Sequence, residues 1–148
     1  MNVVFVASEF NAPIPDRMVE AARAKAKALG VRVVDVVRVP GAWEIPLALR
    51  TILARKEVDA AVAIGAIVTG ETKHDELIAS AVARELMHLQ REFGKPIGLG
   101  ITGPRMTWTQ AEARVKNAAR AVESVVRMAR ASRAPRGRPS RRPRRGPK

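Results

Sequence analysis

The sequence predicts an α/β domain in which a four-stranded parallel sheet is covered by helices on both faces. Four strand-like runs alternate with four helical runs along the chain, and repeated strand–helix units with right-handed crossovers give a doubly wound domain. The third strand-like run, DAAVAIGAIV, is almost entirely apolar, as a strand buried inside a parallel sheet requires. With 148 residues, the chain is long enough for one such domain with its own core.

The first half of the chain holds two strand–helix units. Residues 2–8 (NVVFVAS) form the first predicted strand. A helix rich in Ala, Lys and Arg follows over about 16–29, where Gly30 stops it. Residues 31–39 (VRVVDVVRV) form the second strand, which a Pro-Gly pair ends, and the second helix covers about 43–55. A proline in the first turn of that helix is tolerable, because the backbone N–H it lacks would have no partner there.

The second half repeats the pattern. Strands are predicted over 59–68 and 95–102, and helices over about 73–93 and 107–130. The helix over 73–93 has an apolar residue on one face at each turn, as a helix lying against a sheet requires. These residues are Ile78, Val82, Leu86, Leu89 and Phe93.

The loops after the four strands are the expected place for a binding site. In doubly wound sheets, ligands bind beyond the carboxyl ends of the strands, where the strand order reverses. The loops in question are SEFNAP, PGAWEIP, TGETKH and TGPRMT, in chain order. They are also the segments of most unusual composition, so position and composition point to the same edge of the sheet.

The segment TGETKHDE allows two interpretations. In the first, Thr72 and Asp75 form a capping box at the start of a helix, and His74 is an exposed residue of its first turn. In the second, Gly70 permits close approach of an anion, which the free N–H groups at the helix start, with Thr72 and Lys73, would bind. His74 would then lie at the rim of the site, where an imidazole could transfer protons. Three nearby carboxylates require a second cation under this interpretation.

The other loops hold residues with similar alternatives. Phe10 and Trp43 could be core residues or could stack on a planar ring. Glu44 could favour a helix N-terminus or accept hydrogen bonds from a ligand. Arg114 follows a second capping pattern, Thr107 to Gln110, and could place a fork of donors on a phosphate. The remaining histidine, His88, lies in the middle of a helix without a partner motif and is interpreted as a helix-face residue.

Several classes of function find no support in the sequence. The chain has no phosphate-binding GxxxxGKS/T loop, no GxGxxG after a strand, no Gly-x-Ser-x-Gly elbow and no His/Cys metal cluster. It has no cysteine, which fits a reducing compartment, and no apolar run approaches the ~20 residues that span a membrane. We therefore expect a cytoplasmic protein without a membrane segment, and the sequence does not support the common nucleotide, hydrolase and metal sites.

The positive charge is concentrated at the C-terminus. The net charge is +13, but residues 131–148 hold eight basic residues and no acidic one, which leaves 19 basic and 14 acidic residues, a net of +5, over 1–130. Four prolines and two glycines in this tail predict a disordered appendage beyond a domain of residues 1–130. The tail could bind nucleic acid with little sequence preference, although a solvated appendage is the simpler expectation.

Four segments together resemble the lumazine synthase family. They are SEFN, VPGAWEIPLA, GAIVTGETKHDE and GITGPRMTWTQAEAR, and GETKHDE with the last segment is most similar to the archaeal branch. The resemblance runs from about Val3 to Arg130. It implies a three-layer flavodoxin-like α/β sandwich with a four-stranded parallel sheet. It also implies a pentamer, which in many members assembles into an icosahedral shell of twelve pentamers, with active sites between adjacent subunits.

The resemblance implies a reaction in riboflavin biosynthesis. Members of the family condense 5-amino-6-(D-ribitylamino)uracil with 3,4-dihydroxy-2-butanone 4-phosphate to 6,7-dimethyl-8-ribityllumazine, without a cofactor or metal. The archaeal-type riboflavin synthases are the nearest alternative, because they share the fold, but they lack the GETKHDE pattern. The other alternative is a basic binding module on which the enzyme site is vestigial.

The resemblance also assigns roles to matching positions. His74 would transfer protons, Phe10 would stack on the pyrimidine, and Glu44 would accept from a ribityl hydroxyl. The residues implied for ribitylaminouracil are Phe10, Ala42, Trp43, Glu44, Ala66, Ile67, Val68 and Leu99. Those implied for the phosphate are Glu71, Thr72 and Arg114. Leu99, where many bacterial members have Phe, and Arg114 would come from the neighbouring subunit, and Arg114 would supply the second cation.

Overall fold

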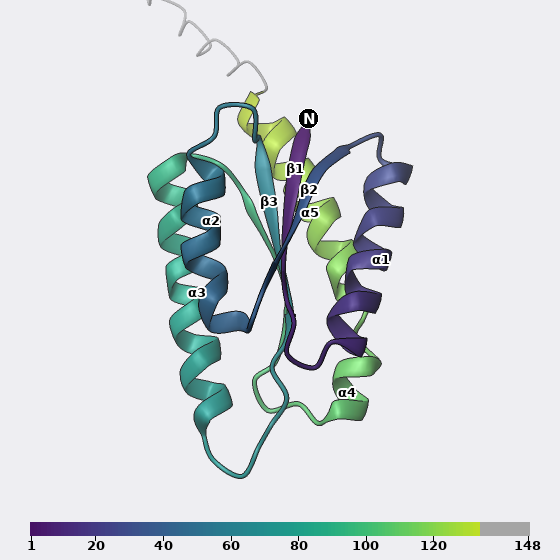
Figure 1. The fold of residues 1–148 in the computed structure, drawn as a ribbon. Helices are drawn as coiled ribbons and strands as arrows, with labels where there is room; N and C mark the ends of the chain where they lie inside the picture. The colour runs from purple at the N-terminus through teal and green to yellow at the C-terminus, as the bar shows by residue number, and fades with distance from the viewer. Residues whose placement is uncertain (134–148) are drawn as a thin grey trace, which may run out of the picture.

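The middle layer of the molecule is a parallel sheet, which confirms the predicted fold class (Figure 1). The computed structural model describes residues 1–133. The strands are β1 (Asn2–Ser8), β2 (Arg32–Val39), β3 (Ala60–Ala66) and β4 (Ile97–Thr102). Their order in the sheet is β2-β1-β3-β4, and every neighbouring pair is parallel. The strand order therefore reverses between β1 and β3.

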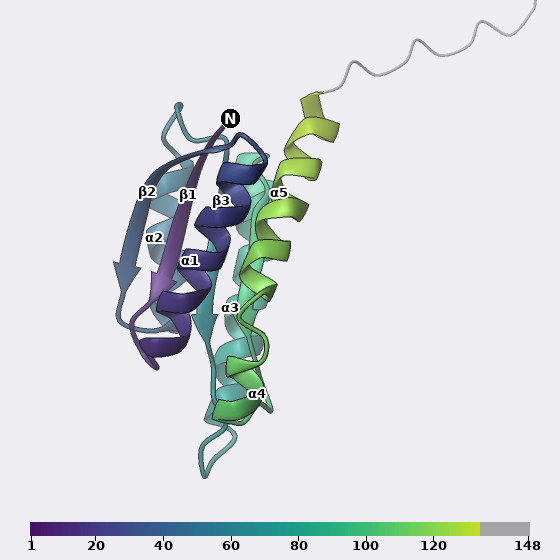
Figure 2. The same cartoon turned by 90° about the vertical axis from the view of Figure 1, so that its right-hand side faces the viewer.

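Helices cover both faces of the sheet, as Figures 1 and 2 show from two sides. The helical elements are α1 (Pro13–Ala28), the 3₁₀ turn η1 (Ala42–Glu44), α2 (Ile45–Leu53), α3 (His74–Phe93), α4 (Trp108–Glu112) and α5 (Asn117–Arg133). The helices α1 and α5 pack on one face, and α2 and α3 on the other. Gly94, at a φ of 61°, ends α3 in the left-handed conformation that glycine adopts at little cost.

The two core clusters explain why the central strands are apolar at every position. Val3 and Phe5 of β1 belong to the cluster under α1 and α5, and Val4 and Val6 belong to the cluster under α2 and α3. All four side chains are fully buried. Successive side chains of a strand point to opposite faces, so a sheet that is covered twice needs apolar residues at both alternations.

The structure corrects three of the expected helices. The single helix expected over 107–130 is two, α4 and α5, with a break at 113–116. The helix expected over 43–55 begins instead with η1 and continues as α2. The first helix starts at Pro13 rather than near residue 16. Prolines are tolerated there because the first turn of a helix needs no N–H donors.

The C-terminal helix continues past the expected domain boundary. Its last residue is Arg133, so the first three residues of the segment 131–148 are helical. The rest of that segment, and with it the expected disorder of the tail, lies outside the described residues. No helix within residues 1–133 is both long and apolar enough to cross a membrane.

Candidate active site

Two adjoining hollows lie at the carboxyl ends of the strands, beside the point where the strand order reverses. They have volumes of about 440 and 410 Å³ and share Phe10, Ala42, His74 and Ile78. Their walls come from the loops after β1, β2 and β3 and from the first turns of α3. The structure thus brings together most of the residues expected to bind the pyrimidine. These are Phe10, Ala42, Trp43, Glu44, Ala66, Ile67 and Val68.

Phe10 forms an open aromatic wall of this pocket. Its side chain is 68% exposed, so it is no core residue, and the ring is free to stack on a planar ligand. The backbone of Gly41 lies directly behind the ring, because a Cβ atom placed on that residue would stand 2.6 Å from Phe10 Cδ2. Only a glycine at position 41 leaves room for the Phe10 ring in this position.

Asn11 is a pocket residue that the sequence analysis missed. It adopts a φ of 61°, a left-handed conformation that asparagine tolerates better than most residues. Its Nδ2 donates a hydrogen bond to the carbonyl oxygen of Ala66, at 2.9 Å. The side chain thereby ties the loop after β1 to the end of β3. The signal available in the sequence was an asparagine next to Phe10 in the loop after the first strand.

Trp43 and Glu44 line the second hollow from the turn η1. Trp43 is 59% exposed. The Oε2 atom of Glu44 accepts a hydrogen bond from the backbone N–H of Gly41 at 3.0 Å. This contact fixes the carboxylate at the pocket wall and leaves Oε1 as the oxygen that can accept from a ligand hydroxyl. Glu44 thus fills both roles that the sequence left open, as a cap and as a pocket carboxylate.

The first turn of α3 places His74 against both hollows. Thr72 lines the first hollow, together with Gly70, whereas Glu71 is exposed and lines neither. The N–H groups at the start of this 20-residue helix face the loop that contains Thr72. Such groups carry the positive end of the helix dipole, which suits an anion.

The expected capping box at the start of α3 is wrong. The cap residue is Lys73, without a side-chain hydrogen bond, and the hydroxyl of Thr72 accepts only a long contact of 3.4 Å from the N–H of His74. The Asp75 carboxylate instead accepts from the backbone N–H of Arg105, at 3.0 Å. That hydrogen bond is the main cause of a pKa below the usual range for Asp75. The second capping pattern is confirmed, because Thr107 and Gln110 bond each other's backbone N–H groups.

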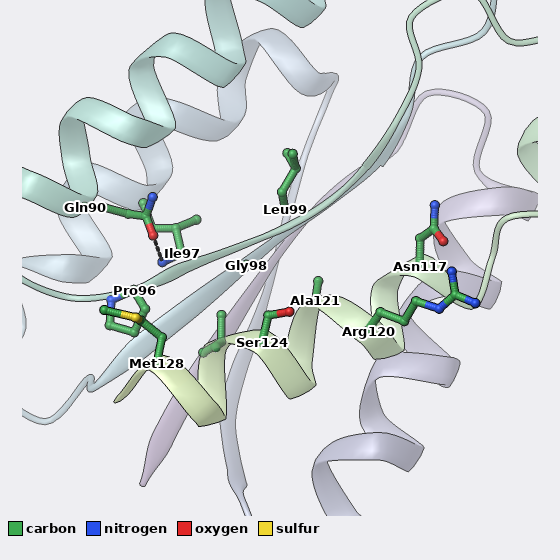
Figure 3. Close-up of a pocket in the computed structure, with 11 residues that line it drawn as sticks. Gln90, Pro96, Ile97, Gly98, Leu99, Asn117, Arg120, Ala121, Ser124 and Met128 are labelled. Atoms are coloured by element: carbon green, nitrogen blue, oxygen red, sulfur yellow. Dashed lines mark hydrogen bonds between the residues drawn. The ribbon is translucent and has the colours of Figure 1, made fainter. Parts of the chain in front are cut away.

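Leu99 and Arg114 lie away from the pocket. Leu99 stands on the edge strand β4, is 60% exposed and points away from α5 (Figure 3). Arg114 is exposed in the break between α4 and α5, where its Nη1 donates to the carbonyl oxygen of Gln110 at 3.1 Å. The buried Ala111 places α4 in the core cluster of α1 and α5, on the opposite face of the sheet from Ile78.

A further hollow lacks the groups that acid–base chemistry needs. It has a volume of about 490 Å³ and lies between α3, β4 and α5 (Figure 3). Gln90, Asn117, Arg120 and Ser124 supply its polar groups, and no carboxylate or histidine lines it. Within residues 1–133 no three metal-ligating side chains form a cluster. The pocket around His74, by contrast, brings a histidine, a carboxylate and an aromatic surface together.

Comparison with known proteins agrees with this geometry. The model of the family described as 6,7-dimethyl-8-ribityllumazine synthase matches residues 1–133. A protein of that name from Staphylothermus marinus is 50% identical over 124 residues, which cover 83% of each chain. One from Methanopyrus kandleri is 49% identical over 125 residues, or 84% of this chain and 89% of the relative. One from Archaeoglobus fulgidus is 46% identical over 123 residues, which cover 83% of this chain and 86% of the relative.

Proposed function

The chain belongs to the 6,7-dimethyl-8-ribityllumazine synthase family, and from that premise we propose how its residues carry out the reaction. The enzyme is a transferase of riboflavin biosynthesis. It condenses 5-amino-6-(D-ribitylamino)uracil with 3,4-dihydroxy-2-butanone 4-phosphate and releases phosphate and water. The observation that carries the residue roles is that Phe10, Glu44 and His74 line the same hollow, the second of the two at the carboxyl ends of the strands.

The pyrimidine binds on the ring of Phe10. The exposed face of that ring offers an apolar plane, on which stacking contributes about 1–3 kcal/mol per base. The end of β3, at Ala66, Ile67 and Val68, supplies backbone groups for the uracil edge. Oε1 of Glu44 accepts a hydrogen bond from a ribityl hydroxyl. Trp43, next to Glu44 in the wall of the same hollow, covers the ribityl chain.

The phosphate of the second substrate binds at the start of α3. Backbone N–H groups and the hydroxyl of Thr72 face it there, and the exposed Glu71 flanks the same turn. Arg114 of an adjacent subunit supplies a fork of N–H donors, since Arg114 of the same subunit lies on the other face of the sheet. Charge-assisted contacts of this kind are the strong ones in phosphate recognition.

The chemistry needs little covalent help from the protein. The 5-amino group attacks the ketone, water leaves to give the imine, phosphate is eliminated, and the ribitylamino nitrogen closes the ring with loss of water. Holding both partners together supplies most of the acceleration. His74 takes and returns the protons of these steps, with a contribution of about 10²- to 10⁴-fold.

A direct assay tests the activity and separates it from that of the related riboflavin synthases. The purified protein is mixed with ribitylaminouracil and butanone phosphate in one reaction, and with dimethylribityllumazine alone in another, and absorbance is recorded. We expect product only in the first reaction. Conversion of dimethylribityllumazine to riboflavin would assign the chain to the other enzyme.

We propose a pentamer as the working form, and a shell of twelve pentamers as its possible further assembly. The support is that Leu99 and Arg114 are exposed and lie outside the pocket they are expected to complete. Sedimentation velocity gives the mass directly. A monomer with full activity would contradict this proposal. We also propose a cytoplasmic location, because the chain lacks cysteine and such chains suit a reducing compartment.

We infer that nucleic acid, where this chain binds it, is bound by the basic segment 131–148. Eight of its 18 residues are basic and none is acidic, which favours phosphate backbones through counterion release. We expect a mobility shift at low salt that disappears when residues 134–148 are deleted. A shift that survives the deletion would move the binding to the folded domain.

A further inference from the structure

One carboxylate in the first turn of α3 is buried and bonded both to the distant loop after β4 and to the segment that precedes the helix. Asp75 is 7% exposed, and among residues 1–133 only Ser8 and Thr102 are other buried polar residues. Its Oδ2 accepts the backbone N–H of Arg105 at 3.0 Å, from 30 residues away. The same oxygen accepts a longer contact from the hydroxyl of Thr69, at 3.4 Å. A single side chain therefore joins α3, the loop after β3 and the loop after β4.

The loop after β4 is fastened around this contact. Arg105 adopts a φ of 58°, which is unfavourable for arginine and persists only where the surroundings hold it. The N–H of Thr69 donates to the carbonyl oxygen of Met106 at 2.7 Å. Nε of Arg105 donates to Oε1 of Glu76 at 2.7 Å. The loop thus contacts α3 and the segment after β3 on both sides of Asp75.

Apart from Asp75 and the exposed pair of Glu76 with Arg105, the start of α3 has no strong hydrogen bond to fix it in the described part of the chain. Its cap residue makes no side-chain hydrogen bond, and the contact between the His74 N–H and Thr72 is 3.4 Å long. A helix start without a cap frays readily. The hydrogen bond from the Arg105 N–H to Asp75 is the half-buried connection between this turn and the loop after β4, whereas the contact of Glu76 with the Arg105 side chain is exposed. His74 is the residue next to Asp75.

These contacts also reduce the negative charge that faces the phosphate. The Asp75 carboxylate is engaged by an N–H donor, and Glu76 is paired with the guanidinium of Arg105. The hydrogen bond to Glu76 raises the pKa of Arg105. Of the three carboxylates at this helix start, only that of Glu71 is left without such a contact in the described part of the chain.

We propose that Asp75 is a positioning residue that holds the first turn of α3, and with it His74, in place over the substrate pocket. It does so through the backbone N–H of Arg105 and transfers no proton itself. The inference rests on the proposed role of His74. A displacement of about 1 Å in a reacting group can cost about 100-fold in rate, so loss of the contact should be visible in turnover.

A double-mutant cycle in the full-length enzyme tests the proposal. Asp75→Ala removes the tie, and Glu76→Ala is the matched control, because it removes a neighbouring first-turn carboxylate but leaves the Arg105 N–H bonded. We expect kcat to fall about 10- to 100-fold in Asp75→Ala and to stay within about threefold in Glu76→Ala. His74→Ala should cost little more in the Asp75→Ala background, because a misplaced imidazole has already lost its effect. Losses that multiply, or an unchanged kcat in Asp75→Ala, would overturn the proposal.

Two further measurements keep the result interpretable. Circular dichroism and thermal melting establish that each variant is folded. Asp75→Asn keeps the volume and one acceptor oxygen, and should recover most of the lost turnover. If Asp75→Ala does not fold, the cycle is run with Asp75→Asn. A fall in kcat of about two- to tenfold that does not multiply with the effect of His74→Ala supports the proposal. An unchanged kcat, or two effects that multiply, refutes it. An unchanged kcat in the single variant His74→Ala would refute both this inference and the proposed role of His74. If His74→Ala lowers kcat as expected but its effect multiplies with that of the Asp75 substitution, only this inference is refuted.

Discussion

The substitution Gly41→Ala should weaken binding of the pyrimidine while leaving the fold intact. Gly41 has a φ of −145° and a ψ of 178°, a conformation open to any residue, so only the added volume matters. Its Cβ would stand 2.6 and 2.9 Å from two carbon atoms of the Phe10 ring and 3.2 Å from Oε2 of Glu44. Ordinary contacts between carbon atoms are about 3.5–4.0 Å, so the ring must move by about 1 Å.

The size of the effect follows from what the ring contributes. Because Phe10 is 68% exposed, the ring can swing toward solvent without disturbing the core, and the melting temperature should hardly change. Stacking contributes about 1–3 kcal/mol per base. Loss of about 1 kcal/mol of it raises the KM for ribitylaminouracil about fivefold. The complete truncation Phe10→Ala should have a larger effect of the same kind.

Steady-state kinetics with each substrate varied in turn is the assay. The KM for butanone phosphate serves as the internal reference and should stay within about twofold. Gly70→Ala is the matched glycine-to-alanine control, because a Cβ there meets no atom within 4 Å, and the KM for the pyrimidine should be unchanged in it. An unchanged KM for the pyrimidine in a folded Gly41→Ala enzyme would refute the role given to the Phe10 ring, as would an equal rise in both constants.

Three further predictions concern the other end of the site. His74→Ala should lower kcat by about 10²- to 10⁴-fold without abolishing it; complete inactivity of the folded variant would show that proximity contributes less than we infer. Arg114→Ala should raise the KM for butanone phosphate about 10- to 100-fold, as loss of a charge-assisted hydrogen bond would, and an unchanged KM would remove Arg114 from the site. The pKa of Asp75 is lowered in the folded protein, mainly by the hydrogen bond from the Arg105 N–H. The ionised carboxylate therefore stabilises the fold at every pH above its unfolded pKa of about 3.9. This contribution is lost as the pH falls through the lowered pKa of the folded protein. Urea midpoints at pH 6 and pH 3 should therefore differ more in the wild type than in Asp75→Asn, and equal differences would contradict the assignment.

The sequence predicted the sheet and the pocket because both depend on patterns that are local in the chain. The apolar run over 59–68 required a strand buried on both faces, and parallel strands bring the loops at their carboxyl ends to one edge. Phe10 remained ambiguous, because an aromatic residue after a strand can turn inward or outward. Its exposure is decided by the close approach of Gly41, which belongs to another loop.

The sequence could not predict contacts between segments that are far apart in the chain. Asp75 fits a local capping pattern, yet its carboxylate accepts a hydrogen bond from the N–H of Arg105. A local motif carries no information on a donor that lies 30 residues away. The break at 113–116 contains neither proline nor glycine, so nothing in the pattern interrupts a long helix there. Asn11 was missed because its role depends on Ala66, at the end of another strand.

Under the proposed site between subunits, the separation of His74 and Arg114 on opposite faces of the sheet would allow complementation between defective subunits. A site completed by a neighbour needs His74 from one chain and Arg114 from the next. Two impaired variants, each lacking one of these residues, would form some intact sites when unfolded and reassembled together. Random mixing in equal amounts would give about one intact site in four.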